Sequence, residues 1–236
     1  MGLPGWLLLM GALTAIGPIS IDMYLPAFPE MAANLGATGS QVERTLAAYL
    51  IGMAGAQLIY GPLADRFGRK PPLYGALLVY ILASAGCALS PTVEFLTVCR
   101  VVQAMGGAAG MVISRAVVRD HYSTQEAARA LSMLMLVMGI APILAPLVGG
   151  QVLALAGWRA IFAVITVSGF ALLIAVSRIM VESLPREKQI ALSWGHIFRT
   201  YCGLIRHRRF VAFALSGGMG SATMFGYLVA SPRLFI

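Results

Sequence analysis

The sequence predicts an all-α membrane protein. Six stretches of at least 18 residues contain no Asp, Glu, Lys or Arg, and a helix of about 20 apolar residues is long enough to cross a bilayer. Composition agrees, since 59% of the residues are hydrophobic, 11% are charged and the mean hydropathy is +0.83. The six stretches are Met1–Ile21, Thr45–Ala64, Pro71–Val93, Ala130–Trp158, Ala160–Ser177 and Phe210–Pro232.

A further span, roughly residues 92–115, lies between the third and fourth of these stretches and carries Arg100. The first span is followed directly by Asp22. Charges inside a membrane are costly and are seldom kept without a function, so these two residues are the first functional candidates.

Taken in order, the spans suggest three parts. Residues 1–181 hold six closely spaced spans and form the N-terminal bundle. Residues 182–209 are polar and basic, with an amphipathic pattern over Ile190–Ile205, and are interpreted as a linker along the membrane surface. Residues 210–236 hold one more span, which we interpret as the first of a second bundle whose remainder lies outside the sequence.

The basic residues predict the orientation. Thirteen Lys and Arg residues lie in or beside the loops after spans 2, 4 and 6, and three lie in the opposite loops or at the far end. Because basic loops stay in the cytoplasm, we expect the N-terminus inside and the end of span 7 outside. The net charge of +8 is therefore explained by topology, and we expect no nucleic-acid partner.

Other classes of protein lack support in the sequence. The three cysteines do not form a disulfide framework, and the three histidines are isolated in loops, so we expect no metal and no cofactor. No nucleophile or catalytic cluster points to an enzyme. The N-terminus lacks the basic region and cleavage site of a secretory signal peptide.

The strongest local motif lies between spans 2 and 3, in residues 61–72, here called the signature loop. Gly68 permits a tight turn, Pro71 and Pro72 suit the first turn of the next helix, and Asp65 can cap a helix or pair with a cation. Asp120, at the inner end of span 4, is available as a partner for Arg69. The motif residues are Gly61, Asp65, Arg66, Gly68, Arg69 and Lys70.

Two further motifs lie within spans. Span 4 carries Arg100, Gln103, Gly106 and Gly107. Span 5 carries Gly139, Pro142, Pro146, Gly149 and Gly150. The two prolines leave carbonyl groups unpaired and bend the helix, and the glycines let another helix approach closely. An ordinary packing face remains an alternative to a functional role for span 5.

These motifs resemble those of the major facilitator superfamily of secondary transporters. Span 5 resembles the antiporter motif of the drug-exporting branch, with Ala145 where glycine is usual, and span 4 has Ala104 where glycine is frequent. Residues 20–29, which include Asp22, are similar to the bicyclomycin/chloramphenicol-resistance (Bcr/CflA) drug:proton antiporters. The resemblance implies the N-terminal six-helix bundle and the seventh transmembrane helix of a twelve-span fold.

Asp22 and Arg100 are expected at the same depth. Each lies about eight residues from the outer end of its span, or roughly 10–12 Å below the outer surface at 1.5 Å per residue. Facing one another they would form an ion pair. That pair is either purely structural or a protonation switch between inward- and outward-facing states, and the resemblance favours the switch, because these positions are commonly implicated in proton coupling in the family.

The function we expect is therefore proton-coupled export of small-molecule drugs across the bacterial cytoplasmic membrane by a monomeric, multi-pass antiporter. The partners are the drug, protons and the lipid bilayer. Two alternatives remain open, a truncated remnant that does not transport and a facilitator for another small solute such as a sugar. A channel would not need the proline- and glycine-containing span 5.

Overall fold

The computed structural model describes residues 4–190 and 194–235. These residues form helices joined by short loops, and no β-strand occurs among them. The chain divides into two compact units, Met1–Ile190 and Ala191–Ile236.

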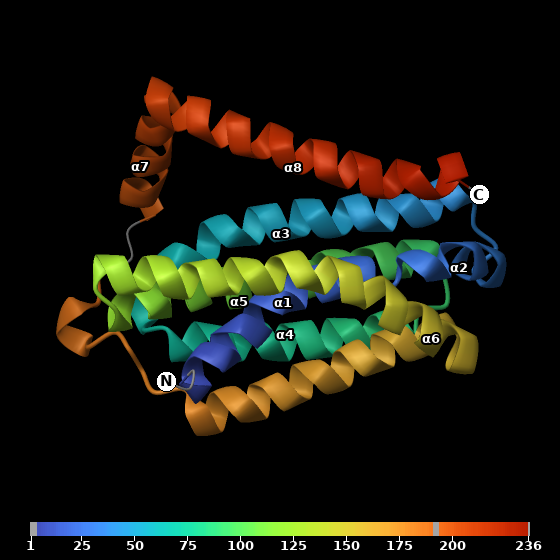
Figure 1. Cartoon of the computed structure of the whole chain (residues 1–236), viewed down its shortest axis with the longest axis horizontal. Coiled ribbons are helices and arrows are strands. Elements are labelled where there is room, and N and C mark those ends of the chain that lie inside the picture. The colour runs from blue at the N-terminus through green and yellow to red at the C-terminus, as the bar shows by residue number, and fades with distance from the viewer. Residues whose placement is uncertain (1–3, 191–193, 236) are drawn as a thin grey trace. The chain divides into compact units, whose positions relative to one another are not determined.

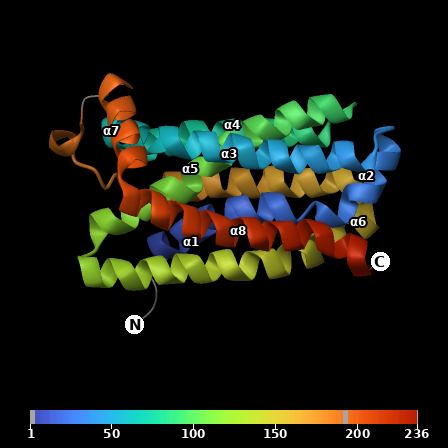
Figure 2. The same ribbon diagram turned by 90° about the horizontal axis from the view of Figure 1, so that it is seen from above.

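The first unit is a bundle of long helices that run alongside one another (Figures 1 and 2). Five segments of the described chain are long and apolar enough to cross a membrane: residues 5–34, 39–67, 70–88, 93–121 and 124–179. The predicted all-helical membrane fold is thus confirmed. The elements are α1 (Gly5–Asp22), η1 (Leu25–Ala27), α2 (Phe28–Asn34), α3 (Gly39–Phe67), α4 (Lys70–Ala88), α5 (Val93–His121) and α6 (Thr124–Ile179).

Helix α6 contains two of the predicted spans. Its 56 residues would reach about 84 Å if straight, far beyond the roughly 30 Å of a bilayer core. The helix breaks at Gly157, which has φ 76° and ψ 175°. Figure 1 shows the chain turning back there, so α6 consists of a first arm (residues 124–156) and a second arm (residues 158–179).

Capping boxes mark where two of the helices begin, and Thr92 caps the start of α5. Thr38 and Gln41 form a capping box at the start of α3, and Ser123 and Glu126 form one at the start of α6. The Ser123 hydroxyl donates to Glu126 Oε2 at 2.7 Å. Helix α4 begins with Pro71 and the adjacent Pro72 in its first turn, as the sequence predicts.

Helix α5 is the centre of the bundle and packs against α3, α4 and α1, while α6 packs against α1 and α4. Small residues permit the close approaches: a Cβ on Gly106 would lie 2.6 Å from the Ala76 carbonyl oxygen of α4. The outer surface of the bundle is apolar, with Ile51 and Leu82 more than 70% exposed. Such exposure suits helices that face lipid.

The second unit holds α7 (Trp194–Arg206), which is strongly amphipathic, and α8 (Arg208–Phe235). The predicted seventh span, residues 210–236, falls within α8 except for residue 236, which lies outside the described residues. Helix α8 is not one of the five segments that are long and apolar enough to cross a membrane. Residues 182–190, which the sequence assigns to the linker, group with the first unit and include η2 (Arg186–Lys188).

Candidate functional site

Arg100 lies in the middle of the bundle and is completely buried. Its guanidinium carbon lies 4.2 Å from the ring centroids of both Tyr24 and Tyr49, and 5.8 Å from that of Phe162. A desolvated cation stacked on aromatic rings gains about 2 kcal/mol or more per favourable pair. The aromatic side chains therefore offset part of the free energy that burial of this charge requires.

Hydrogen bonds hold one edge of the guanidinium. Arg100 Nη1 donates to Gln103 Oε1 at 2.6 Å, and Gln103 Nε2 donates to the Ser84 hydroxyl at 2.8 Å. The Ser84 hydroxyl in turn donates to the Tyr80 carbonyl at 2.6 Å. Two residues of the span-4 motif thus form a chain of contacts from α5 to α4. The other edge is free, because Arg100 Nε and Nη2 have no hydrogen-bond partner in the described chain.

Asp22 ends α1 and is 2% exposed. One of its carboxylate oxygens, Oδ1, is buried and has no hydrogen-bond partner among the described residues. The ion pair that the sequence suggests between Asp22 and Arg100 is not formed, since the ion pairs that the structure describes belong to Arg69. The physical reason is that Arg100 is held by Gln103 and enclosed by aromatic rings.

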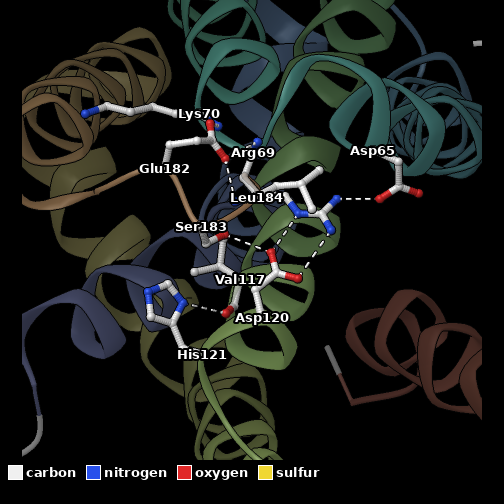
Figure 3. A network of polar contacts seen from close by, with 9 residues as sticks. All are labelled: Asp65, Arg69, Lys70, Val117, Asp120, His121, Glu182, Ser183 and Leu184. Carbon is white, nitrogen blue, oxygen red and sulfur yellow. Dashed lines mark hydrogen bonds and ion pairs between the residues drawn. The ribbon is translucent and has the colours of Figure 1, made fainter. Parts of the chain in front are cut away.

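The signature loop is the second cluster (Figure 3). Arg69, 7% exposed, donates from Nη1 to Asp65 Oδ1 at 2.5 Å and from Nε to Asp120 Oδ2 at 2.9 Å. Burial lowers the pKa of Arg69, but the hydrogen bonds that its guanidinium donates to the two carboxylates outweigh this effect and raise the pKa above its usual value. The pair expected between Arg69 and Asp120 is therefore present, and the loop is tied to the end of α5.

Glu182, which follows the C-terminal end of α6, binds the same loop. Its carboxylate accepts the backbone N–H groups of Arg69 at 2.8 Å and Lys70 at 3.0 Å. These groups begin α4 and have no partner within that helix, so Glu182 caps it. Gly68 precedes them with φ 88°, and a Cβ there would lie 2.7 Å from Glu182 Oε2.

Two more contacts join the chain beyond α6 to this cluster. The Ser183 hydroxyl donates to Asp120 Oδ2 at 2.8 Å, and Lys70 Nζ donates to the Met180 carbonyl at 2.6 Å. Arg66, also in the motif, takes no part in the cluster and lies exposed. The sequence identifies four of the motif residues found here but not Glu182 and Ser183, because a carboxylate 113 positions beyond Arg69 gives no local signal.

The span-5 motif lies on the first arm of α6. A Cβ on Gly149 would collide with the Met23 carbonyl, so α6 and the end of α1 approach closely there. Gly139 and Gly150 have open space where a Cβ would be. Beside this approach an apolar pocket of about 310 Å³ lies between α1 and α6. Its lining includes Ile19, Met23, Ile140, Leu144 and Val148.

Sequence reasoning also missed the residues that enclose Arg100. Tyr24 lies two positions after Asp22, but Tyr49 and Phe162 are aromatic residues in apolar spans, where packing is the ordinary explanation. Within the part of the chain that the structure describes, no group of three or more His, Cys, Asp or Glu side chains could hold a metal ion.

Comparison with known proteins shows the family. The profile of the Major Facilitator Superfamily matches residues 10–233. The chain is 39% identical over 229 residues to the Bacillus subtilis "Uncharacterized MFS-type transporter YdgK", covering 96% of the chain and 57% of that protein. It is 32% identical to the Haemophilus influenzae "Bicyclomycin resistance protein homolog", covering 98% of the chain and 58% of that protein. It is 33% identical to the Pseudomonas aeruginosa "Chloramphenicol resistance protein", covering 97% of the chain and 54% of that protein.

Solved structures agree on the fold. The human organic anion transporter MFSD10 matches with a TM-score of 0.65 at 18% identity, covering 83% of this chain and 53% of that one. A mutant of the peptide transporter POT in complex with alafosfalin matches with a TM-score of 0.67 at 18% identity, covering 98% of this chain and 47% of that one.

The chain spans a little over half the length of these three curated relatives. The resemblance to the bicyclomycin- and chloramphenicol-resistance transporters that its motifs indicate is confirmed by those relatives. The superfamily profile matches nearly the whole sequence, and the structure is a bundle of apolar helices. This chain therefore belongs to the Major Facilitator Superfamily.

Proposed function

We propose that this chain forms the N-terminal bundle and the first span of the second bundle of a proton-coupled drug exporter. Carriers of this superfamily bind substrate between two bundles that rock around it. The chain supplies binding and coupling groups and no catalytic ones. It lies in the bacterial cytoplasmic membrane with its N-terminus inside and works in a carrier that needs no second copy.

The observation that carries this proposal is the presence of two buried charged side chains inside the bundle, Asp22 and Arg100. A buried carboxylate without a partner at Oδ1, in an apolar bundle, is expensive when ionised, and this cost suits a residue that exchanges a proton during transport. Protonation removes one charge from the bundle interior and shifts the balance between states that expose Asp22 differently to water. That is the behaviour required of a coupling site.

Drug export is the activity that the names of the relatives suggest, and two drugs follow from them as first probes, bicyclomycin and chloramphenicol. We expect a carrier of the relatives' length that contains this chain to raise the resistance of a drug-sensitive host to at least one of them. In inverted vesicles, a proton gradient should drive that drug inward against its concentration.

The same assay separates the alternatives. Movement of a sugar down its gradient, without drug transport, would identify a facilitator. A carrier of the relatives' length that moves neither drug nor sugar, although it reaches the membrane, would contradict both export and the facilitator. The chain by itself, reconstituted without a second bundle, is expected to show no uphill transport.

A further inference from the structure

The described chain contains three glycines with positive φ, and the turns at two of them have the same local arrangement. Gly68 has φ 88° and ψ 171°, and Gly157 has φ 76° and ψ 175°. Each lies seven positions after another glycine, Gly61 and Gly150 respectively, and a basic residue follows two positions later in both turns. Gly36, the third, has φ 58°, and a Cβ there would meet no atom within 4 Å.

A glutamate from a distant segment closes each of these two turns. At Gly68 it is Glu182. At Gly157 it is Glu30 of α2, whose Oε1 would lie 3.2 Å from a Cβ on the glycine and accepts the Trp158 N–H at 3.4 Å. The chain then begins a helix in both cases, and the carboxylate accepts backbone N–H groups that lack an intrahelical partner, two at Glu182 and one at Glu30.

Each of the two glutamates comes from one half of the bundle and binds a turn in the other half. Residues up to the end of α4 form the first three spans, and α5 with the two arms of α6 forms the second three. Glu30 belongs to the first half and holds a turn of the second, whereas Glu182 follows the second half and holds a turn of the first. The halves interleave, because α5 packs on α3 and α4 while α6 packs on α1 and α4.

Arg159 adds a further tie at the Gly157 turn. Its Nη2 donates to the Ser90 carbonyl beyond the end of α4 at 3.1 Å, and its guanidinium lies 4.3 Å from a ring of Trp158. Lys70 occupies the matching position at the Gly68 turn and donates to the Met180 carbonyl at 2.6 Å. The basic residue two positions after each glycine therefore binds a carbonyl just beyond a helix end in the opposite half.

We propose that Glu30 and Glu182 are reciprocal clamps, one at each membrane face, that lock the two interleaved three-helix halves into one rigid body. A bundle that rocks as a unit must not shear between its halves, and these contacts join the halves at their two ends. Glu30 is thus a positioning residue for transport, although it lies outside every motif of the family resemblance. This role in transport rests on the proposed function, whereas the clamp contacts do not.

Backbone amide hydrogen exchange on the purified chain in nanodiscs tests the contacts without any transport. Glu30→Ala should make exchange about tenfold faster at residues 158–160 and leave Arg69 and Lys70 unchanged, since loss of one hydrogen bond to a charged group corresponds to about that factor. Glu182→Ala should give the reverse pattern. Glu94→Ala, which removes an exposed carboxylate in the first turn of α5, is the matched control and should change neither turn.

Transport by a carrier of the relatives' length then tests the positioning role. Glu30→Ala should lower the maximal rate of drug export at least fivefold and leave the apparent affinity within twofold, and Glu30→Gln, which keeps an acceptor oxygen, should restore part of the rate. Unchanged exchange at residues 158–160 would overturn the outer clamp. Faster exchange with a normal rate would overturn its role in transport, and a wild-type carrier that moves no drug would contradict the proposed function while the exchange result stands.

Discussion

Arg69 and Asp120 are 51 positions apart in the sequence and form an ion pair, in which Arg69 Nε donates to Asp120 Oδ2 at 2.9 Å (Figure 3). Asp65 takes a second edge of the same guanidinium. One arginine therefore ties the end of α3 to the end of α5, and its backbone N–H reaches Glu182 beyond α6. The signature loop is consequently a junction of three spans and not only a marker of topology.

The first prediction concerns this junction. Arg69→Ala leaves two carboxylates without their shared cation and should lower the free energy of unfolding by about 1–3 kcal/mol. Arg66→Ala removes the same charge three positions earlier from an exposed side chain and should change stability by less than about 0.5 kcal/mol. Thermal unfolding of both variants in the same detergent measures the difference. Equal midpoints would show that the network does not stabilise the bundle.

The second prediction concerns the turn at Gly68. Ala at φ 88° and ψ 171° is strained by about 1–3 kcal/mol, and its Cβ would lie 2.7 Å from Glu182 Oε2. Gly68→Ala should therefore cut drug export sharply at matched membrane abundance, and Gly68→Val should do so more strongly. Within this chain, Gly61→Ala near the end of α3 meets nothing within 4 Å and should leave the thermal midpoint unchanged, whereas Gly68→Ala should lower it. Normal efflux by the Gly68 variants would reduce the loop to a topology signal.

The third prediction separates two adjacent glycines of the span-5 motif. Gly149→Ala drives a methyl group into the Met23 carbonyl and should force α1 and α6 apart, with a loss of about 1–3 kcal/mol in stability. Gly150→Ala meets nothing within 4 Å and should be neutral or slightly stabilising within this chain. Expression level and thermal midpoint, compared between the two single variants, give the measurement. If both behave alike, the close approach at Gly149 is not a constraint.

The fourth prediction concerns orientation. In a variant without Cys87, Cys99 and Cys202, a single cysteine at Ser40 should react with a membrane-impermeant maleimide added to whole cells. A single cysteine at Glu187 should react only after the cells are opened. Both positions are exposed, so accessibility alone does not decide the outcome. The reverse labelling pattern would invert the topology that the basic loops predict.

The sequence could predict the spans because their signal is local. Apolar runs mark the helices, and the two-residue segment between α3 and α4, Gly68 and Arg69, follows from one glycine and two prolines. Helix α6 is an example, since its two arms correspond to the predicted spans Ala130–Trp158 and Ala160–Ser177 and are separated at Gly157, which has a positive φ. The motif residues were identified by order and type, which is also local information.

What the sequence could not show depends on contacts over long distances. Counting residues along the spans predicts that Asp22 and Arg100 lie at the same depth in the membrane. The count does not give the direction in which each side chain points from its helix. Arg100 turns toward Gln103 and two tyrosines, so the expected ion pair is absent. Glu30 and Glu182 act on turns far away along the chain, and an isolated glutamate near a helix end has no distinguishing pattern.

The last prediction follows from the absence of an ion pair between Asp22 and Arg100. Because Asp22 forms no ion pair and its Oδ1 has no partner in the described chain, Asp22→Asn should fold as well as the wild type or slightly better, since it removes a buried carboxylate. The same change should abolish proton-coupled export if Asp22 carries the coupling proton, because Asn cannot titrate. Drug binding should persist. Glu94→Gln, the same change at an exposed carboxylate, should transport normally. Drug-driven proton movement in vesicles, measured beside thermal unfolding, gives both readouts, and full coupling in Asp22→Asn would assign the proton to another carboxylate.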